Sequence, residues 1–108
     1  MKAPKFIIIN GTLVMGVVDY HKDLIDKSLV NPDVIGGGRF LRAYAEQKHY
    51  ILFYGKSEDF GKIRRADFEL FILTDKSLKD QVFIFSDKEY ASDAIAEAKA
   101  LVGEKRWR

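Results

Sequence analysis

The sequence predicts an α+β fold: one domain built on a mixed β-sheet of five or six strands with helices packed on it. Short β-branched and aromatic runs alternate with segments of helical periodicity, which indicates this mixture. The 108 residues can bury one hydrophobic core and are too few for two domains. Apolar residues make up 47% and charged residues 31%, which is typical of a globular chain. We therefore take residues 1–108 as a single domain.

The chain opens with a predicted β-hairpin. Residues 5–9 are β-branched and aromatic, as strands are. Asn10-Gly11 follows, and this pair favours a type I′ turn because both central residues of that turn need a positive φ. The returning strand, Thr12–Val18, is almost entirely apolar. This composition predicts burial on both faces and hence a central position in the sheet.

A first helix is expected after this hairpin. Asp19 can cap it through its carboxylate, and apolar residues within positions 20–29 recur at helical spacing. Asn31-Pro32 should end it. Extended segments follow at residues 34–35 and 39–45.

Further elements complete the predicted sheet and its helices. A turn at residues 46–48 leads to a strand at 49–54, and residues 66–73 fit a helix better than a strand. A short strand is predicted at 82–85. Ser86 and Glu89 have the spacing of a capping box for a C-terminal helix whose apolar face runs to residue 102, and Gly103 should end that helix.

Composition excludes several classes of function. The absence of cysteine rules out disulfides, thiolate nucleophiles and zinc sites of the cysteine type. The net charge of +2 comes without the concentrated basic face that nucleic-acid binding requires. The apolar run at residues 6–9 is too short for a signal-peptide core or a membrane span, so we expect a cytoplasmic protein with no membrane partner. We interpret the basic tail, residues 105–108, as a solvated terminus.

His21 is the first candidate for chemistry, because it would lie in the first turn of the first helix. The amides of a first turn have no intrahelical partners and can bind an anion. The helix dipole also disfavours imidazolium there, which keeps the ring able to accept a proton. A neutral base beside a phosphate site is what hydrolysis of a phosphoryl group requires. His49 is interpreted as structural or exposed, and the sequence predicts no metal site and no cofactor.

Two glycine-rich segments are further candidates. Three successive glycines, residues 36–38, pack nothing in a strand. They indicate either a bulge or tight crossing, or room for a ligand or for a side chain from elsewhere. Arg39 follows them and can offer a forked donor to a phosphate. Around Ser57, in residues 54–61, flanking glycines allow main-chain amides to converge on an anion, although a plain polar loop has the same composition.

The order and spacing of these segments resembles the janus family of protein phosphohistidine phosphatases. The shared features are a Tyr-His pair at Tyr20 and His21, a Gly-Gly-Gly-Arg run that ends at Arg39, and a Tyr-Gly-x-Ser-x-x-aromatic-Gly loop around Ser57. Lys5, followed by an aromatic residue, stands where that family carries a Lys-aromatic pair in its first strand. The resemblance ends before the C-terminal helix.

The resemblance implies a metal-independent phosphatase that acts on phosphohistidine in proteins, with His21 as nucleophile or acid/base. The residues it implies for phosphate binding are Lys5, Tyr20, Lys22, Gly36, Arg39, Ser57 and Asp59. The cations at positions 5 and 39 would flank the phosphoryl group. Main-chain amides at residues 21–22 and 57–59 would cradle it.

This sequence departs from the family at Glu58 and Asp59, where the family loop is small and neutral. Two carboxylates near a phosphate dianion cost roughly 1 kcal/mol each when partly solvated. Backbone cradles usually present amides inward and side chains outward, so we expect only the amides of these residues to face the site. The family also carries an arginine in the strand before the Tyr-His pair, and residues 11–18 contain no base.

Two other functions stay open on the sequence alone. A catalytically silent domain of the same fold could bind phosphorylated partners or another anion, or an apolar sheet edge or the extra helix could mediate assembly. The sequence does not separate phosphohistidine from phospholysine and does not indicate an oligomeric state.

Overall fold

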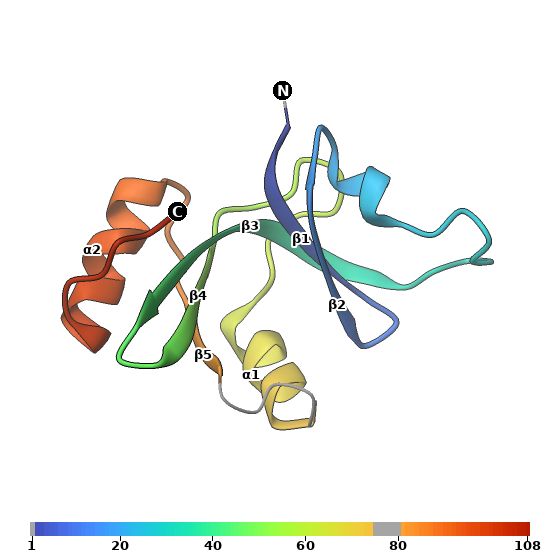
Figure 1. Ribbon diagram of the computed structural model, residues 1–108. Coiled ribbons are helices and arrows are strands. Elements are labelled where there is room, and N and C mark those ends of the chain that lie inside the picture. The colour runs from blue at the N-terminus through green and yellow to red at the C-terminus, as the bar shows by residue number, and fades with distance from the viewer. Residues whose placement is uncertain (1, 75–80) are drawn as a thin grey trace.

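The computed structural model describes residues 2–74 and 81–108, in which five strands form one mixed sheet (Figure 1). The strands are β1 (Ala3–Ile9), β2 (Thr12–Val18), β3 (Val34–Ala45), β4 (Lys48–Tyr54) and β5 (Gln81–Phe85). Their order across the sheet is β2-β1-β3-β4-β5, and all neighbours are antiparallel except β4 and β5. A 3₁₀ helix, η1 (His21–Leu24), and two α-helices, α1 (Arg65–Thr74) and α2 (Ala91–Val102), complete the described elements. The predicted α+β fold is confirmed.

The N-terminal hairpin forms as predicted, but its second strand lies elsewhere in the sheet. Asn10 and Gly11 have φ of 51° and 74°, and Ile9 pairs with Thr12 across the turn. The central position predicted for β2 is wrong, because β2 is an edge strand. The apolar composition of β2 has another explanation. One face of the strand packs on the core beside α1, and the other face packs against η1.

The predicted first helix is reduced to the single turn of η1. Asp19 does not cap it. Tyr20 is the N-cap, and its amide donates to the carboxylate of Asp23 at 3.0 Å. The chain then leaves the helix, since the Asp26 carboxylate accepts both the amide and the hydroxyl of Ser28 at 2.9 Å. Such local bonds offer the backbone an alternative to helical pairing.

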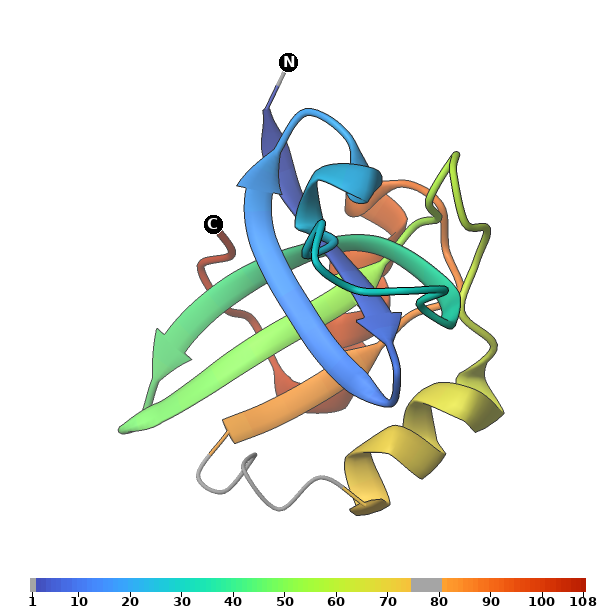
Figure 2. The same ribbon diagram turned by 90° about the vertical axis from the view of Figure 1, so that its right-hand side faces the viewer.

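Two clusters of apolar side chains cover the two faces of the sheet. Residues in alternation along a strand point to opposite faces. Phe53 packs with Phe68 of α1, whereas its neighbour Leu52 packs in the cluster that contains Ala94 of α2. Accordingly, α1 and α2 lie on opposite sides of the sheet in Figures 1 and 2. The helix predicted at residues 66–73 is confirmed.

The C-terminal helix ends as predicted but starts differently. Gly103, with φ of 80°, follows the last turn of α2. The predicted capping box of Ser86 and Glu89 is wrong, because Tyr90 is the N-cap and no side chain caps the helix. Ser86 is instead buried, and its hydroxyl donates to the carboxylate of Glu97 at 3.1 Å. None of the helices described is long and apolar enough to cross a membrane.

The basic tail is docked on the domain, so its interpretation as a solvated terminus is wrong. The amide and carbonyl of Arg108 pair with those of Arg42 in β3, each at 2.8 Å. Trp107 packs against the cluster beside α2. The ammonium of Lys105 lies 5.2 Å from the centre of the Tyr50 ring.

Candidate functional site

A row of three side chains forms the floor of the candidate site. Lys5 of β1 pairs with Arg39 of β3, and Arg39 pairs with Tyr54 of β4. Residues that are directly opposite in neighbouring strands share a face of the sheet. Tyr54 belongs to the cluster beside α2, so the row lies on the α2 face. On this face η1 covers β1 and β2, and α2 covers β4.

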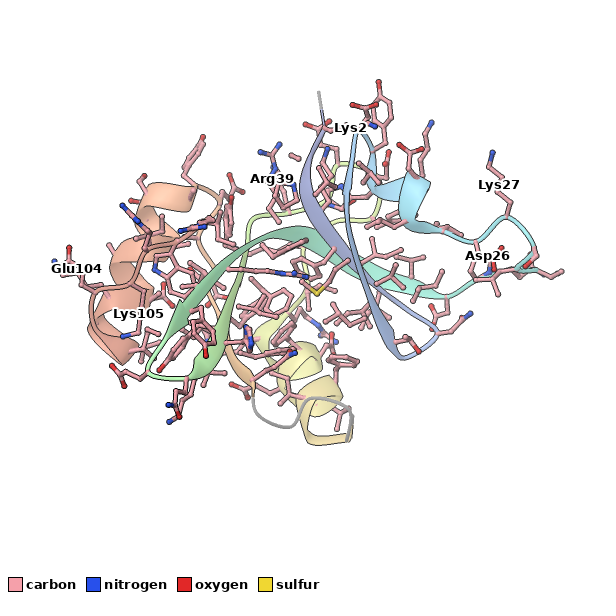
Figure 3. The ribbon with its side chains drawn as sticks, viewed as in Figure 1. Lys2, Asp26, Lys27, Arg39, Glu104 and Lys105 are labelled. Atoms are coloured by element: carbon pink, nitrogen blue, oxygen red, sulfur yellow. The ribbon has the colours of Figure 1, made fainter. Side chains whose placement is uncertain are left out.

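A cleft of about 680 Å³ opens between these two covers, and we call it the His21 cleft. Figure 3 shows Arg39 rising from the sheet between α2 and η1. The cleft is lined by the floor (Lys5, Arg39, Tyr54), the η1 side (Asp19, Tyr20, His21), the loop after β4 (Gly55, Lys56, Glu58, Asp59) and the start of α2 (Glu89, Tyr90, Ala91). The structure thus brings together His21 and four of the residues predicted to bind phosphate: Lys5, Tyr20, Arg39 and Asp59.

The His21 ring is held in a defined orientation. Its side chain is only 5% exposed, and Nε2 lies 2.8 Å from the carbonyl oxygen of Gly38. A carbonyl oxygen only accepts, so Nε2 carries the hydrogen and donates. Nδ1 forms no hydrogen bond with any described residue, and none of their fully buried side-chain nitrogens or oxygens lacks a partner. Nδ1 is therefore not fully buried, its lone pair is not used by any described residue, and His21 itself lines the cleft.

Both alternatives left open for residues 36–38 hold in part. The register between β1 and β3 shifts beside Gly36, and a Cβ at Gly37 or Gly38 would lie 2.4 Å from a carbonyl oxygen of a neighbouring strand. Two of the glycines also make room for side chains from elsewhere. A Cβ at Gly37 would lie 3.2 Å from Cδ2 of His21. A Cβ at Gly36 would lie 2.9 Å from Cδ1 of Ile63, in the cluster beside α1. Gly36 does not line the His21 cleft, and Gly37 is the glycine that lets the catalytic candidate approach the sheet.

The pKa of His21 is lowered from its ordinary value of 6.5, chiefly because burial penalises the charged ring. The hydrogen bond that Nε2 donates to the carbonyl oxygen of Gly38 and the charge of Asp59 raise this pKa in part, whereas the positive charges of Lys5 and Arg39 lower it further. The lowered pKa favours the neutral ring at neutral pH, which is the state that the sequence predicts. The cause is burial and not a helix dipole, because η1 is a single 3₁₀ turn.

The ammonium of Lys5 is hydrogen-bonded to the main chain. Its side chain is 7% exposed, and its ammonium donates to the carbonyl oxygens of Val18, at 3.2 Å, and of Asp19. These carbonyls end β2 and begin the turn that carries His21. Lys5 therefore supplies both a positive charge beneath the cleft and a tie that fixes this turn.

Lys22 and Ser57 lie outside the lining of the cleft. The ammonium of Lys22 lies over the exposed ring of Tyr20, 5.2 Å from its centre. Ser57 is 2% exposed, and its hydroxyl accepts the amide of Phe60 at 3.0 Å. The main chains of Ser57 and Gly61 also bond each other. Ser57 thus shapes the loop instead of facing a ligand.

The loop carries amides and carboxylates to the cleft. The amides of Glu58 and Asp59 donate to no group within the described part of the chain, which leaves them available to an anion. Both residues are exposed, and the charge of Asp59 acts on the His21 ring. The expectation that only the amides of this loop face the site stays a prediction, although the charge of Asp59 reaches His21.

The wall formed by the segment that leads into α2 was not among the predicted site residues. Glu89 and Tyr90 line the cleft there, and the ammonium of Lys56 lies 3.7 Å from the carboxylate of Glu89. This ion pair links the loop to the segment that leads into α2. No local pattern predicts it, because its partners are brought together by the pairing of β4 with β5 and by the bond from the Gly55 amide to the Lys88 carbonyl.

Comparisons with protein-family models and with curated proteins find no match to this chain. Across residues 2–74 and 81–108, no three histidine, aspartate or glutamate side chains gather as a group that could hold a metal ion.

Proposed function

We propose that this chain is a metal-independent phosphatase that hydrolyses the phosphorus–nitrogen bond of phosphohistidine in proteins. The observation that carries the proposal is the state of His21. The residue is buried, its pKa is lowered, a main-chain carbonyl accepts the hydrogen of Nε2, and it lines a cleft with a cationic floor while Nδ1 has no partner among the described residues. A neutral imidazole held in one tautomer can act as a base or a nucleophile at neutral pH.

The cationic floor supports binding of the phosphoryl group. Lys5 and Arg39 are cross-strand partners on one face of the sheet, and both line the cleft. The guanidinium offers donors in a fork that matches phosphate oxygens, and the ammonium adds a point charge. The amides of residues 58–59 supply further donors from the loop. Donors fixed before the reaction stabilise charge that develops in the transition state.

The reaction uses the lone pair of His21 Nδ1. An oxygen of water forms a bond to phosphorus, the phosphorus–nitrogen bond breaks, and the leaving imidazole of the substrate takes up a proton. His21 serves this step either by accepting the proton of the attacking water or by attacking phosphorus first. In the second route water then hydrolyses the phosphorylated His21. Because phosphoramidates are intrinsically labile, one base and a charged site are sufficient.

The test is phosphate release from a phosphohistidine peptide, with His21→Ala beside His49→Ala. His49 is exposed and lies outside the His21 cleft, so its variant is the matched control. We expect release by the wild type and by His49→Ala, and a loss of at least about 100-fold in His21→Ala. Chelators should change nothing.

Two results would contradict this proposal. Release that survives in His21→Ala would reject the role assigned to that residue. A wild type that binds the phosphorylated peptide without releasing phosphate would be a catalytically silent domain that binds phosphorylated partners.

A further inference from the structure

The rim of the His21 cleft is opposite in charge to its floor. The floor cations, Lys5 and Arg39, come from β1 and β3. The rim carboxylates of Glu58 and Asp59 come from the loop after β4, and both residues are exposed. Within the described part of the chain neither of them forms an ion pair, whereas Glu89 on the same rim pairs with Lys56 at 3.7 Å.

This separation of charge limits what fits the cleft. A phosphate dianion is attracted by the cations of the floor and repelled by the carboxylates of the rim. Inorganic phosphate is therefore complementary in charge to the floor alone. A ligand that satisfies both halves carries a negative group and, next to it, a positive group. His21 is buried, lines the cleft and leaves Nδ1 without a partner among the described residues, so this residue marks where the negative group comes.

We propose that the substrates of this cleft are phosphohistidine segments with lysine or arginine beside the phosphorylated residue, and that Glu58 and Asp59 determine this specificity. This inference rests on the proposed function. The phosphoryl group lies over the floor, next to His21 Nδ1, and the neighbouring basic side chain lies against the rim. The long stems of lysine and arginine allow the charged group to reach the carboxylates while the peptide main chain crosses the mouth of the cleft.

The first experiment measures binding by fluorescence anisotropy. The probes are three labelled peptides that carry a non-hydrolysable phosphonate analogue of phosphohistidine, flanked by basic, neutral or acidic residues. A fourth peptide has basic flanks and no phosphonate. At low salt we expect the basic phosphonate peptide to bind about fivefold more tightly than the neutral one, which is the effect of two exposed ion pairs. Rising salt should reduce this preference.

Two double variants connect the preference to the rim. Glu58→Gln with Asp59→Asn should abolish it. Glu69→Gln with Glu104→Gln removes the same charge from exposed residues outside the cleft and should leave it unchanged. Figure 3 shows Glu104 on the far side of α2 from Arg39.

The outcomes separate this inference from the proposed function. Equal affinity for basic and neutral phosphonate peptides overturns the inference, as does a preference that survives in the rim variant. Binding of the unphosphorylated basic peptide as tightly as its phosphonate form also overturns it. Phosphate release from the matching phosphohistidine peptides is measured separately. Binding that depends on the flanking residues, without release of phosphate, refutes the phosphatase activity and supports the specificity. Release of phosphate, with binding that does not depend on the flanking residues, supports the phosphatase activity and refutes the specificity.

Discussion

Replacing Gly37 by alanine tests whether the glycine run is needed for the close approach of both β1 and His21. A Cβ at this position would lie 2.4 Å from the carbonyl oxygen of Phe6 and 3.2 Å from Cδ2 of His21. The carbonyl belongs to the neighbouring strand β1, so it cannot move aside without disturbing the sheet. The ring of His21 must shift as well, which lengthens its bond to Gly38.

The magnitude follows from two opposing effects. Overpacking of a well-packed site costs about 1–3 kcal/mol. Alanine lowers the conformational entropy of the unfolded chain relative to glycine, and this raises the free energy of unfolding by about 0.4–1 kcal/mol. Because the Cβ of Gly37→Ala would conflict with a backbone atom, we expect an overpacking cost near the upper end of its range. The free energy of unfolding should therefore fall by about 2 kcal/mol in total. For a domain of this size that lowers Tm by about 10 °C.

Thermal unfolding followed by circular dichroism measures this loss, with Gly16→Ala as the control. A Cβ at Gly16 would lie 2.9 Å from Cδ2 of Leu24, the far end of a flexible side chain that can turn away. This variant should therefore change stability by less than about 1 kcal/mol. Equal stability of the two variants would refute the reasoning. Phosphate release should fall in Gly37→Ala and persist in Gly16→Ala.

Three further predictions concern other parts of the structure. Because the pKa of folded His21 lies below 6.5, the unfolded chain binds this proton more readily. The contribution of His21 to the free energy of unfolding is therefore fully present above pH 6.5 and is lost as pH falls from 6.5 through the pKa of the folded state. Urea unfolding at a series of pH values in this range should show that the free energy of unfolding depends less on pH in His21→Gln than in the wild type. Lys5→Met leaves the carbonyls of Val18 and Asp19 without their donor, which should lower the free energy of unfolding by about 1–2 kcal/mol. An unchanged urea midpoint would contradict the stabilising role of these two hydrogen bonds. Trp107→Ala should cost about 2 kcal/mol by the same measurement, since the ring is partly buried against the core, whereas no loss would mean that the tail is not docked.

Local chemistry predicted part of the fold correctly. The turn at Asn10-Gly11 follows from residues that accept positive φ, and the end of α2 follows from Gly103. The edge position of β2 could not be predicted, because different elements cover its two faces and give it a fully apolar sequence. The reduction of the first helix to one turn depends on a competing bond between Asp26 and Ser28, which spacing alone does not reveal.

The site was predictable where one strand register brings its residues together. Lys5 and Arg39 are cross-strand partners, and His21 follows the adjacent edge strand, so three short segments suffice to define the centre of the cleft. The wall that contains Glu89 depends on long-range packing of α2. Gly36 and Ser57 were assigned to the phosphate although the structure uses them to pack Ile63 and to close the loop, two roles that their residue types serve equally well.

The state of His21 is the central claim, and long-range ¹H–¹⁵N NMR on the protein with labelled histidine tests it most directly. At neutral pH the account predicts a neutral ring with the hydrogen on Nε2 and a free lone pair on Nδ1. Addition of the phosphonate analogue of a phosphohistidine peptide should then shift the Nδ1 resonance, while both nitrogens of His49 stay unchanged. A hydrogen on Nδ1, an imidazolium at neutral pH, or an Nδ1 resonance that does not respond to a bound analogue would contradict the account.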